Sequence, residues 1–353
     1  MNSVKRFETY RMFFAIMIAL LVSFGIIFCI SSEPVTAIIT MITGPLKSKR
    51  SFGNVIETMI PLLFTGTGVC IMFSANQINL ATDGAFQMGG LVAAAAVLNM
   101  GLPTPVALLL SLAVGALVCM IPALMKIFTG ASEMVASLML NYVALWFCTF
   151  VLMHFMLDPG VGAASYKLPA DAELLTLVKG TNVHIGLLIG LAGVAFGYVF
   201  LYKSKIGYEL RITGENEEFA RYSGINVVRV ILISQLVGGM FAGLGGGVEI
   251  LGPIYARFSW LALLGYGWDA IILSTLAKNN PLYIPFAAFF LAYLRTGASI
   301  MARSTDVTLE IVQITQGIIV MLVVAEQFLS KMRHRLIAKE AKAALKEEEV
   351  AKC

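Results

Sequence analysis

Long apolar stretches alternate with short polar stretches along most of this chain, from Tyr10 to Leu329. Each apolar stretch holds roughly twenty residues, and a helix of that length crosses a bilayer core of about 30 Å. We predict ten spans, at Tyr10–Ser31, Ile56–Ser74, Asp83–Met100, Thr104–Lys126, Ser132–His154, Val183–Tyr202, Val230–Leu251, Trp260–Ala277, Leu282–Ile300 and Thr308–Leu329. The pattern therefore predicts an all-α membrane protein of about ten transmembrane helices, with both chain ends on one side.

Two polar interruptions within the apolar pattern resemble each other. Ser74–Gly90 reads SANQINLATDGAFQMGG and follows a span that contains glycine. Leu264–Asp269 reads LGYGWD and follows the glycine-rich stretch Gly238–Gly247. Helices broken at corresponding places in two halves are typical of transporters whose path forms between internal repeats. We therefore expect broken or re-entrant segments, and two pseudo-symmetric halves of about five spans each.

A polar segment, Lys203–Arg229, separates the sixth and seventh predicted spans. Nine of its 27 residues are charged, against 13% for the whole chain. Its inner part predicts a short helix, because Asn216 can cap it and Gly224 can end it. Glu217 and Arg221 are spaced i,i+4 with the acid first, which is the better order. Phe219 and Tyr222 share one face of this helix, so the segment is either a docking element or an ordinary solvated loop.

Composition and charge agree with a membrane protein. The chain is 58% hydrophobic with a mean hydropathy of +0.85, above the 45–50% apolar share typical of soluble domains. Of the 25 Lys and Arg residues, 17 lie in segments that would be cytosolic if the N-terminus is cytosolic. We therefore expect both termini in the cytosol, although the cluster Lys47–Arg50 argues against this locally. Residues 1–329 form the predicted membrane domain, and residues 330–353 form a charged cytosolic tail.

Several acidic residues in or near the predicted spans have a simple structural explanation. A charge at the bilayer centre costs about 2.5–3.5 kcal/mol on insertion scales, so such residues usually face the protein interior or water. Asp83, Glu133 and Glu310 lie near predicted helix starts, where an acid meets the positive end of the helix dipole. Glu326 lies near an inner helix end and is expected to reach the interface.

Other polar residues are less easily explained by helix ends. Glu249 and Asp269 lie beside glycines, and each either lines a polar cavity or binds freed backbone N–H groups. Amide side chains such as Asn79 and Asn141 cannot face lipid without a partner. Gly239, Gly243 and Gly247 recur every four residues, which predicts close helix packing and no substrate role. The candidates for a translocation path or gate are Asn79, Asp83, Asn141, Glu249 and Asp269.

The sequence lacks the motifs of common enzymes. It contains no GxxxxGK[ST] loop for nucleotide phosphates and no HExxH. The histidines His154, His184 and His334 are far apart and show no metal-ligand spacing, and no Ser/His/Asp set is suggested. We therefore predict no catalytic residue, metal site or cofactor in this chain, and favour a transport component over an enzyme.

Several stretches carry a resemblance to a known family. They read GYELRITGENEEFARYSGI (Gly207–Ile225), GASEMVASLMLNYVAL (Gly130–Leu145), AGLGGGVEILG (Ala242–Gly252), GYGWDAIILSTLAKNNP (Gly265–Pro281), and the segment Pro61–Gly90. Over Thr58–Ala325 the chain resembles the integral-membrane permease subunits of bacterial ABC importers in the branched-chain amino acid, ribose and nucleoside superfamily. It is most similar to the BMP-type nucleoside, or simple sugar, permeases. It departs from their pattern at the first break, where Asp83 and Ala85 replace the usual Glu and Gln, and at LSTLAKNNP.

The resemblance implies a multi-subunit importer in the bacterial plasma membrane. Two permease chains, identical or different, would pair, and an extracytoplasmic lipoprotein would deliver a nucleoside or sugar. A separate cytosolic ATPase would bind ATP and Mg²⁺ and would contact the segment Lys203–Gly224. The residues expected to carry this coupling are Arg211, Glu215, Asn216, Phe219, Arg221, Tyr222 and Gly224.

Three alternatives stay open at this point. The first is a permease of the same family that imports a simple sugar such as ribose. The second is a self-contained, ion-coupled carrier that uses Asp83 and Asp269 and needs no ATPase. The third is a membrane scaffold without transport activity, in which Glu249 and Asp269 could be replaced freely by leucine.

Overall fold

The computed structural model describes residues 33–254 and 257–306, together with the single positions 21, 25, 28 and 317. Apart from those single positions, the first predicted span (Tyr10–Ser31), the last (Thr308–Leu329) and the tail lie outside the described residues. Glu310 and Glu326 lie outside them too.

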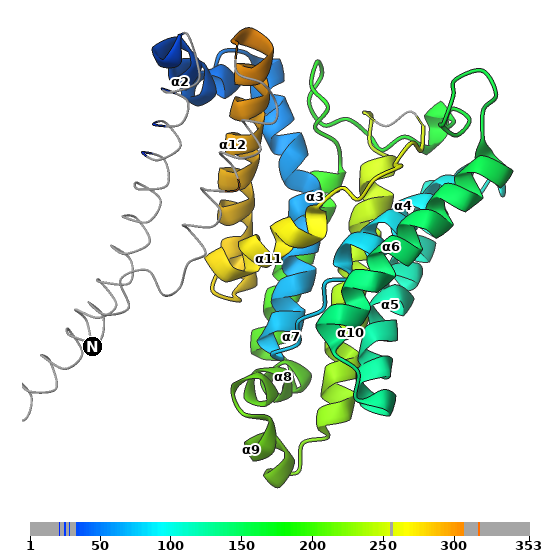
Figure 1. The fold of residues 1–353 in the computed structure, drawn as a ribbon, viewed down its shortest axis with the longest axis vertical. Coiled ribbons are helices and arrows are strands. Elements are labelled where there is room, and N and C mark those ends of the chain that lie inside the picture. The colour runs from blue at the N-terminus through cyan, green and yellow to red at the C-terminus, as the bar shows by residue number, and fades with distance from the viewer. Residues whose placement is uncertain are drawn as a thin grey trace, which may run out of the picture. The chain divides into compact units, whose positions relative to one another are not determined.

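The described residues are predominantly α-helical, as the sequence predicts (Figure 1). Only two isolated β-bridges are found in this part of the chain, Leu157 with Ser165 and Thr176 with His184. The α-helices are α2 (Pro34–Thr43), α3 (Lys49–Ser74), α4 (Thr82–Leu98), α5 (Thr104–Thr129), α6 (Glu133–Val151), α7 (Gly186–Lys203), α8 (Lys205–Glu215), α9 (Glu217–Tyr222), α10 (Val227–Ile250), α11 (Tyr266–Leu276) and α12 (Ile284–Ser304). The shorter elements are 3₁₀ turns at Gly44–Leu46, Ala170–Ala172 and Pro281–Tyr283, and a π-helical turn at Leu152–Met156.

Six of the described helices are long and apolar enough to cross a membrane: α3, α5, α6 with its π-helical turn, α7, α10, and α12 with the preceding 3₁₀ turn. The expected total of about ten spans is not confirmed. Helix α4 has 17 residues and reaches about 25 Å at 1.5 Å per residue, so it is shorter than a typical span.

The predicted span Trp260–Ala277 is wrong. Helix α11 has only 11 residues, and about 16 Å of helix cannot cross a bilayer core. Gly265 adopts the left-handed conformation with φ +79° before it, and Lys278 does so with φ +53° after it. The residues between Trp260 and α11 are therefore non-helical. Trp260 itself is buried and packs against Gly90 and Phe86, whereas Leu261 is exposed.

Helix α3 begins earlier than predicted, at Lys49 instead of Ile56. The Ser48 hydroxyl accepts a hydrogen bond from the backbone N–H of Ser51 (3.0 Å), which caps the helix. The basic cluster at residues 47–50 therefore lies at a helix start, where hydropathy alone indicates a loop. The segment before it, which lies between the first two predicted spans, contains α2.

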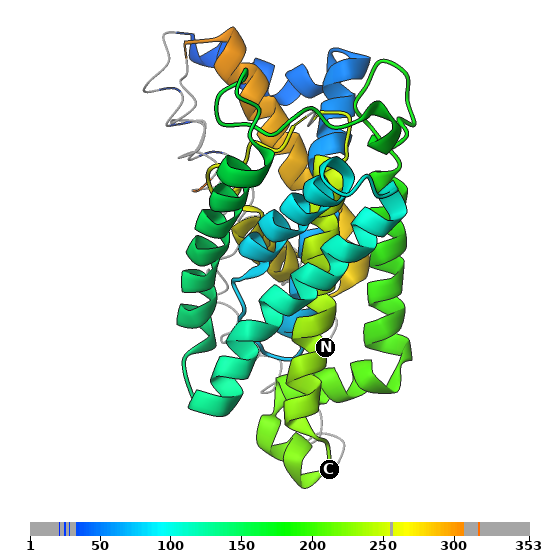
Figure 2. The same ribbon diagram turned by 90° about the vertical axis from the view of Figure 1, so that its right-hand side faces the viewer.

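Residues Pro45–Thr296 form one compact unit, and the remaining described residues belong to a second. In the first unit α10 packs against α3, α4 and α5. A side chain at Gly239 or Gly243 would overlap the backbone of α5, and one at Gly247 would overlap the Ser111 side chain. The predicted close packing of this glycine series is thus confirmed. Helices α8 and α9 lie at one end of this unit, and the connection between α6 and α7 lies at the opposite end (Figure 2).

Candidate functional site

The first break in the helical pattern is the link between α3 and α4, residues 75–81. Its backbone is held by Asn79, whose amide nitrogen donates to the carbonyl oxygen of Cys119 (2.8 Å) and to Oε1 of Gln235 (2.7 Å). The amide oxygen of Asn79 accepts from the backbone N–H of Ala81 (2.8 Å). Asn79 is fully buried, so its side chain fixes the shape of the link.

A chain of polar side chains extends from Asn79 to the end of α5. Gln235 of α10 donates from Nε2 to Oε1 of Glu133 (2.7 Å). Lys126 pairs with Oε2 of Glu133 (3.1 Å) and donates to Oε1 of Gln77 (2.5 Å). Glu133 lies in the first turn of α6, as expected, and in addition has a partly exposed lysine partner. Sequence analysis missed Gln235, whose partners are more than 100 residues away, and Lys126, whose partner Glu133 lies on a different helix.

Asn141 of α6 supports the same link from the other side. Its amide nitrogen donates to the carbonyl oxygen of Leu80 (2.8 Å), and its amide oxygen accepts from the backbone N–H of Gly84 (2.8 Å). Ser137 accepts from the backbone N–H of Leu80 (3.0 Å). The first break is therefore a non-helical segment whose freed backbone groups are bonded by side chains, as a membrane interior requires.

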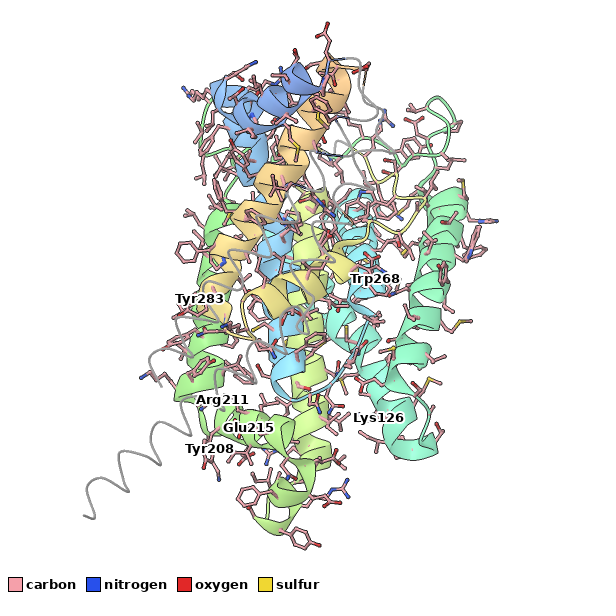
Figure 3. The ribbon with its side chains drawn as sticks, turned by 60° about the vertical axis from the view of Figure 1, so that its left-hand side comes forward. Lys126, Tyr208, Arg211, Glu215, Trp268 and Tyr283 are labelled. Carbon is pink, nitrogen blue, oxygen red and sulfur yellow. The ribbon has the colours of Figure 1, made fainter. Side chains whose placement is uncertain are left out.

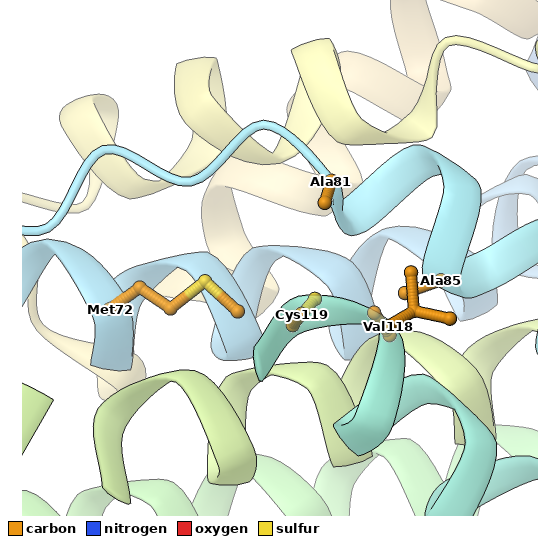
Figure 4. Close-up of a cluster of buried hydrophobic side chains, with 6 residues drawn as sticks. Met72, Ala81, Ala85, Val118 and Cys119 are labelled. Carbon is orange, nitrogen blue, oxygen red and sulfur yellow. The ribbon is translucent and has the colours of Figure 1, made fainter. Parts of the chain in front are cut away.

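Apolar side chains seal this polar network. Met72, Ala81, Ala85, Val118, Cys119 and Ala242 form a buried cluster that joins α3, α4, α5 and α10 (Figure 4). Cys119 contributes both to this cluster and, through its carbonyl oxygen, to the bond with Asn79. The cysteine thus acts as a small buried hydrophobic residue.

The second break, predicted at Leu264–Asp269, meets the first at the start of α4; its described non-helical part is residues 257–265, and α11 begins at Tyr266. Oδ2 of Asp83 accepts from the backbone N–H of Gly265 (3.2 Å), directly before α11. A side chain at Gly267 would come within 2.9 Å of the Asp83 backbone nitrogen. The two predicted breaks therefore lie against each other, so the N-terminus of α11 lies close to that of α4. The pseudo-symmetry of the two halves stays a prediction.

A buried ion pair connects α11 to α12 beside this contact. Both carboxylate oxygens of Asp269 contact the Arg295 guanidinium, each at 2.6 Å. Asp269 is buried, and Arg295 is partly buried within α12. Arg295 lies inside the predicted span Leu282–Ile300, within α12. An arginine inside an apolar stretch needs an acidic partner, and this signal could have paired it with Asp269.

Three polar atoms at the start of α4 are buried without a hydrogen-bond partner among the described residues: Oγ1 of Thr82, Oδ1 of Asp83 and Oε1 of Gln87. The other end of the Gln87 amide donates to the carbonyl oxygen of Trp260 (3.1 Å). The Phe86 ring packs against Trp260 and Tyr266, with centroids 5.6 and 4.8 Å apart. The site thus combines aromatic walls with acceptors that a hydroxyl-bearing or amino-bearing ligand could bond.

Glu249 lies apart from the Asp269–Arg295 pair. It is buried near the end of α10 and lines a small cavity with Glu57 and His184. Burial lowers the pKa of His184, which precedes α7, to about 4, so this imidazole is neutral at neutral pH. Within the described part of the chain, no group of His, Cys, Asp and Glu residues has the arrangement of a metal site.

The short helix predicted in the polar segment is confirmed as α9. Oδ1 of Asn216 accepts from the backbone N–H of Phe219 (3.0 Å), and Glu217 pairs with Arg221 (2.6 Å). Gly224 adopts the left-handed conformation with φ +80°. Phe219 is 59% exposed and Tyr222 is 92% exposed, so the helix presents aromatic side chains to its surroundings.

Sequence analysis missed the longer helix α8, which carries Arg211 and Glu215 (Figure 3). The Ser204 hydroxyl caps it by accepting from the backbone N–H of Gly207 (2.9 Å). The Arg211 guanidinium lies over the Tyr202 ring, 4.7 Å from its centroid. Helix α8 therefore connects α9 to the end of α7 through a cation–π contact.

At the opposite end of the unit, an ion pair orders the connection between α6 and α7. Arg257 donates to Asp158 (2.5 Å) and to the carbonyl oxygen of Ser165 (2.8 Å). The hydrogen bond from Arg257 lowers the pKa of Asp158 below its ordinary value. Asp158 therefore stays charged at neutral pH.

Comparison with known proteins matches residues 51–324 to the family described as "Branched-chain amino acid transport system / permease component". The glucose ABC transporter permease protein TsgB13 of Haloferax volcanii is 30% identical, over 85% of this chain and 83% of that protein. The nucleoside ABC transporter permease protein NupB of Lactococcus lactis is 26% identical, over 94% and 95% of the two chains. The guanosine ABC transporter permease protein NupP of Bacillus subtilis is 27% identical, over 77% and 80%.

Proposed function

Since this chain belongs to the branched-chain amino acid transport system permease family, we propose that it is the membrane-spanning subunit of an ATP-driven nucleoside importer. A separate cytosolic ATPase would bind ATP and Mg²⁺, and an extracytoplasmic lipoprotein would deliver the substrate. A second permease, identical or different, would complete the path in the bacterial plasma membrane. Both termini would be cytosolic, as the distribution of basic residues favours.

The observation that carries the proposal is the exposed aromatic face of α9. Phe219 and Tyr222 are the side chains we assign to the ATPase contact. Helix α9 is itself well anchored, because Ala220 packs with Val227, Ile231 and Ala123 of α10 and α5. A force on α9 would therefore reach two membrane helices directly.

The other coupling residues would give this element its shape. Asn216 and Gly224 would set its start and end, and Arg221 would hold it through Glu217. Arg211 and Glu215 would pass movement through α8 to α7, supported by the contact between Arg211 and Tyr202.

We assign the translocation gate to the place where the first and second breaks meet. Transporters commonly bind substrate where discontinuous helices meet. Asp83 and Asp269 would act at this junction, and Glu249 would act nearer the outer end of α10. Asn79 and Asn141 would position the gate by holding the first break, because their side chains are already bonded to the backbone.

Nucleoside is the substrate class we favour, because two of the three relatives described above carry nucleoside or guanosine in their names. The alternative is a simple sugar, and the relative from Haloferax volcanii is named for glucose. Competition of labelled nucleoside uptake by unlabelled nucleosides, ribose and glucose distinguishes these substrates.

The ATPase contact is tested by Phe219→Asp in the assembled transporter. A charge on the exposed face should abolish ATP-driven uptake while the spans stay inserted, and ATP hydrolysis should no longer respond to substrate. Phe219→Leu, which keeps the site apolar, is the matched control and should retain most of the uptake. Normal transport by Phe219→Asp would remove α9 from the ATPase contact.

An ion-coupled carrier is the second candidate, because Asp83 of α4 accepts from the backbone N–H of Gly265, directly before α11, and Asp269 lies in the first turn of α11. Purified chain alone in liposomes separates the two functions. Uptake driven by a proton or sodium gradient, without any ATPase, would favour the carrier. Uptake only with the ATPase and ATP would favour the importer.

A further inference from the structure

A groove between α5 and the first half of α10 has a volume of about 460 Å³. Its floor is apolar, with Met120 from α5 and Leu232, Ile233 and Leu236 from α10. Its end nearest α9 is polar, with Asn226 and Arg229 beside Val228. The groove thus changes from apolar to basic along its length.

The polar end offers hydrogen-bond donors. Arg229 is exposed, and its side chain makes no ion pair with any described residue. Oδ1 of Asn226 is occupied by the backbone N–H of Arg229 (3.0 Å), which leaves the donor side of this amide available. A guanidinium and an amide N–H₂ are well suited to phosphate oxygens.

We propose that this groove binds an anionic phospholipid, with its phosphate at Arg229 and Asn226 and one acyl chain along Leu232, Ile233 and Leu236. The eight residues from Arg229 to Leu236 extend about 10 Å along the helix, which suits the part of an acyl chain next to the headgroup. A soluble anion would not need the apolar floor, and an uncharged lipid would not need the guanidinium. Basic pockets at the membrane surface between helices are a known setting for anionic headgroups.

A second groove of the same size serves as an internal comparison. It lies between α5 and α6, has a volume of about 470 Å³, and is lined by Ile121, Met125, Ala131, Ser132, Val135, Ala136, Met139, Leu140 and Val143. No charged side chain lines it. It should therefore accept acyl chains without preference for the headgroup.

The site adjoins the anchor of α9. The start of α10 packs with Ala220 of α9 through Val227 and Ile231. A phosphate at Arg229 would therefore lie next to α9, the helix that we assign to ATPase coupling. Anionic lipid bound there should stabilise the position of α9. This consequence rests on the proposed function, whereas lipid binding itself does not.

The test measures lipid bound to the purified full-length chain by native mass spectrometry, with phosphatidylglycerol and phosphatidylcholine as probes. The wild type should prefer phosphatidylglycerol, and Arg229→Gln should lower its affinity about fivefold, as expected for one basic residue near a lipid surface. Arg229→Lys should retain most of the preference. Lys205→Gln, which removes an exposed charge of α8 outside the groove, should change nothing.

A second variant keeps the proposal testable if Arg229→Gln folds poorly. Leu236→Trp fills the apolar part and should weaken phosphatidylglycerol binding while Arg229 is intact. Equal binding of the two lipids by the wild type, or an unchanged preference in Arg229→Gln, would overturn the proposal. A change of oligomeric state in Arg229→Gln would overturn it as well, because it would make the groove an interface between proteins.

The lipid measurement and the transport measurement fail independently. Lipid preference without any effect of Phe219→Asp on uptake would keep the lipid site and remove the ATPase contact. Loss of uptake in Phe219→Asp, together with no lipid preference in the wild type, would keep the ATPase contact and remove the lipid site.

Discussion

The two breaks in the helical pattern differ in how completely their buried polar groups are hydrogen-bonded. At the first break, residues 75–81, Asn79, Asn141 and Ser137 bond the freed backbone, and Glu133 is held by Gln235 and Lys126. Where the second break meets α4, one buried ion pair is complete, yet three buried polar atoms have no partner among the described residues. The two regions touch through Asp83 and Gly265.

This difference indicates that the first break is a rigid support and that the second break is the part that moves. A fully bonded network holds one backbone conformation, because any shift leaves several buried groups without partners. Unpartnered acceptors cost stability in the observed conformation and can gain partners in another one or with a ligand. We therefore expect the first break to stay rigid during transport, while α11 and the start of α4 change their contacts.

The largest expected effect comes from breaking the ion pair at the second break. Arg295→Ala leaves the buried Asp269 carboxylate without its partner, and should lower the free energy of unfolding by about 3 kcal/mol. Thermal unfolding of the purified chain in detergent measures this. Arg303→Ala, an exposed arginine of the same helix, is the control and should have little effect.

The double variant Asp269→Ala/Arg295→Ala sharpens the result. It removes both charges, so it should be more stable than Arg295→Ala alone. Equal stability of Arg295→Ala and the wild type would mean that the ion pair contributes nothing to the free energy of unfolding.

A smaller effect is expected at the first break. Asn79→Ala removes three hydrogen bonds and leaves Gln235 and two backbone groups with fewer partners, so unfolding should become about 2 kcal/mol easier. Asn99→Ala, at the exposed end of α4, is the matched control. Unfolding in increasing denaturant measures both variants, and an unchanged midpoint for Asn79→Ala would contradict a structural role for the network.

The smallest expected effect on stability is that of Thr82→Val. Because the Thr82 hydroxyl has no partner among the described residues, its loss should change the unfolding free energy by less than about 0.5 kcal/mol or raise it slightly. The control Thr67→Val removes a bonded, equally buried hydroxyl and should cost about 1 kcal/mol. If Thr82 serves the path, uptake should change in Thr82→Val although stability does not. A large loss of stability would instead reveal a bond that holds Thr82 in place.

Sequence patterns predicted the local features well. Asn216, the pair of Glu217 with Arg221, and Gly224 lie within nine residues, so short-range rules were sufficient for α9. Short-range rules were also sufficient for the glycine series of α10. Its glycines recur every four residues, so they share one face of the helix, and that face packs closely against its neighbour. Hydropathy failed at α11, since it reports apolar composition and not helix length, and an apolar non-helical segment followed by a short helix has the hydropathy of a span.

The amino-acid sequence by itself determined that this chain is a helical membrane protein, where most of its helices begin and end, and which family it resembles. The first two properties depend on hydropathy and on capping contacts between near neighbours, and the resemblance depends on short sequence motifs. Only the tertiary structure decided which polar residues meet. Asn79 and Gln235 are 156 positions apart, and Asp269 and Arg295 are 26 apart. Such pairs depend on how whole helices pack, so the sequence names the candidates, and the packed helices alone show which of them are bonded and which are left open for a ligand.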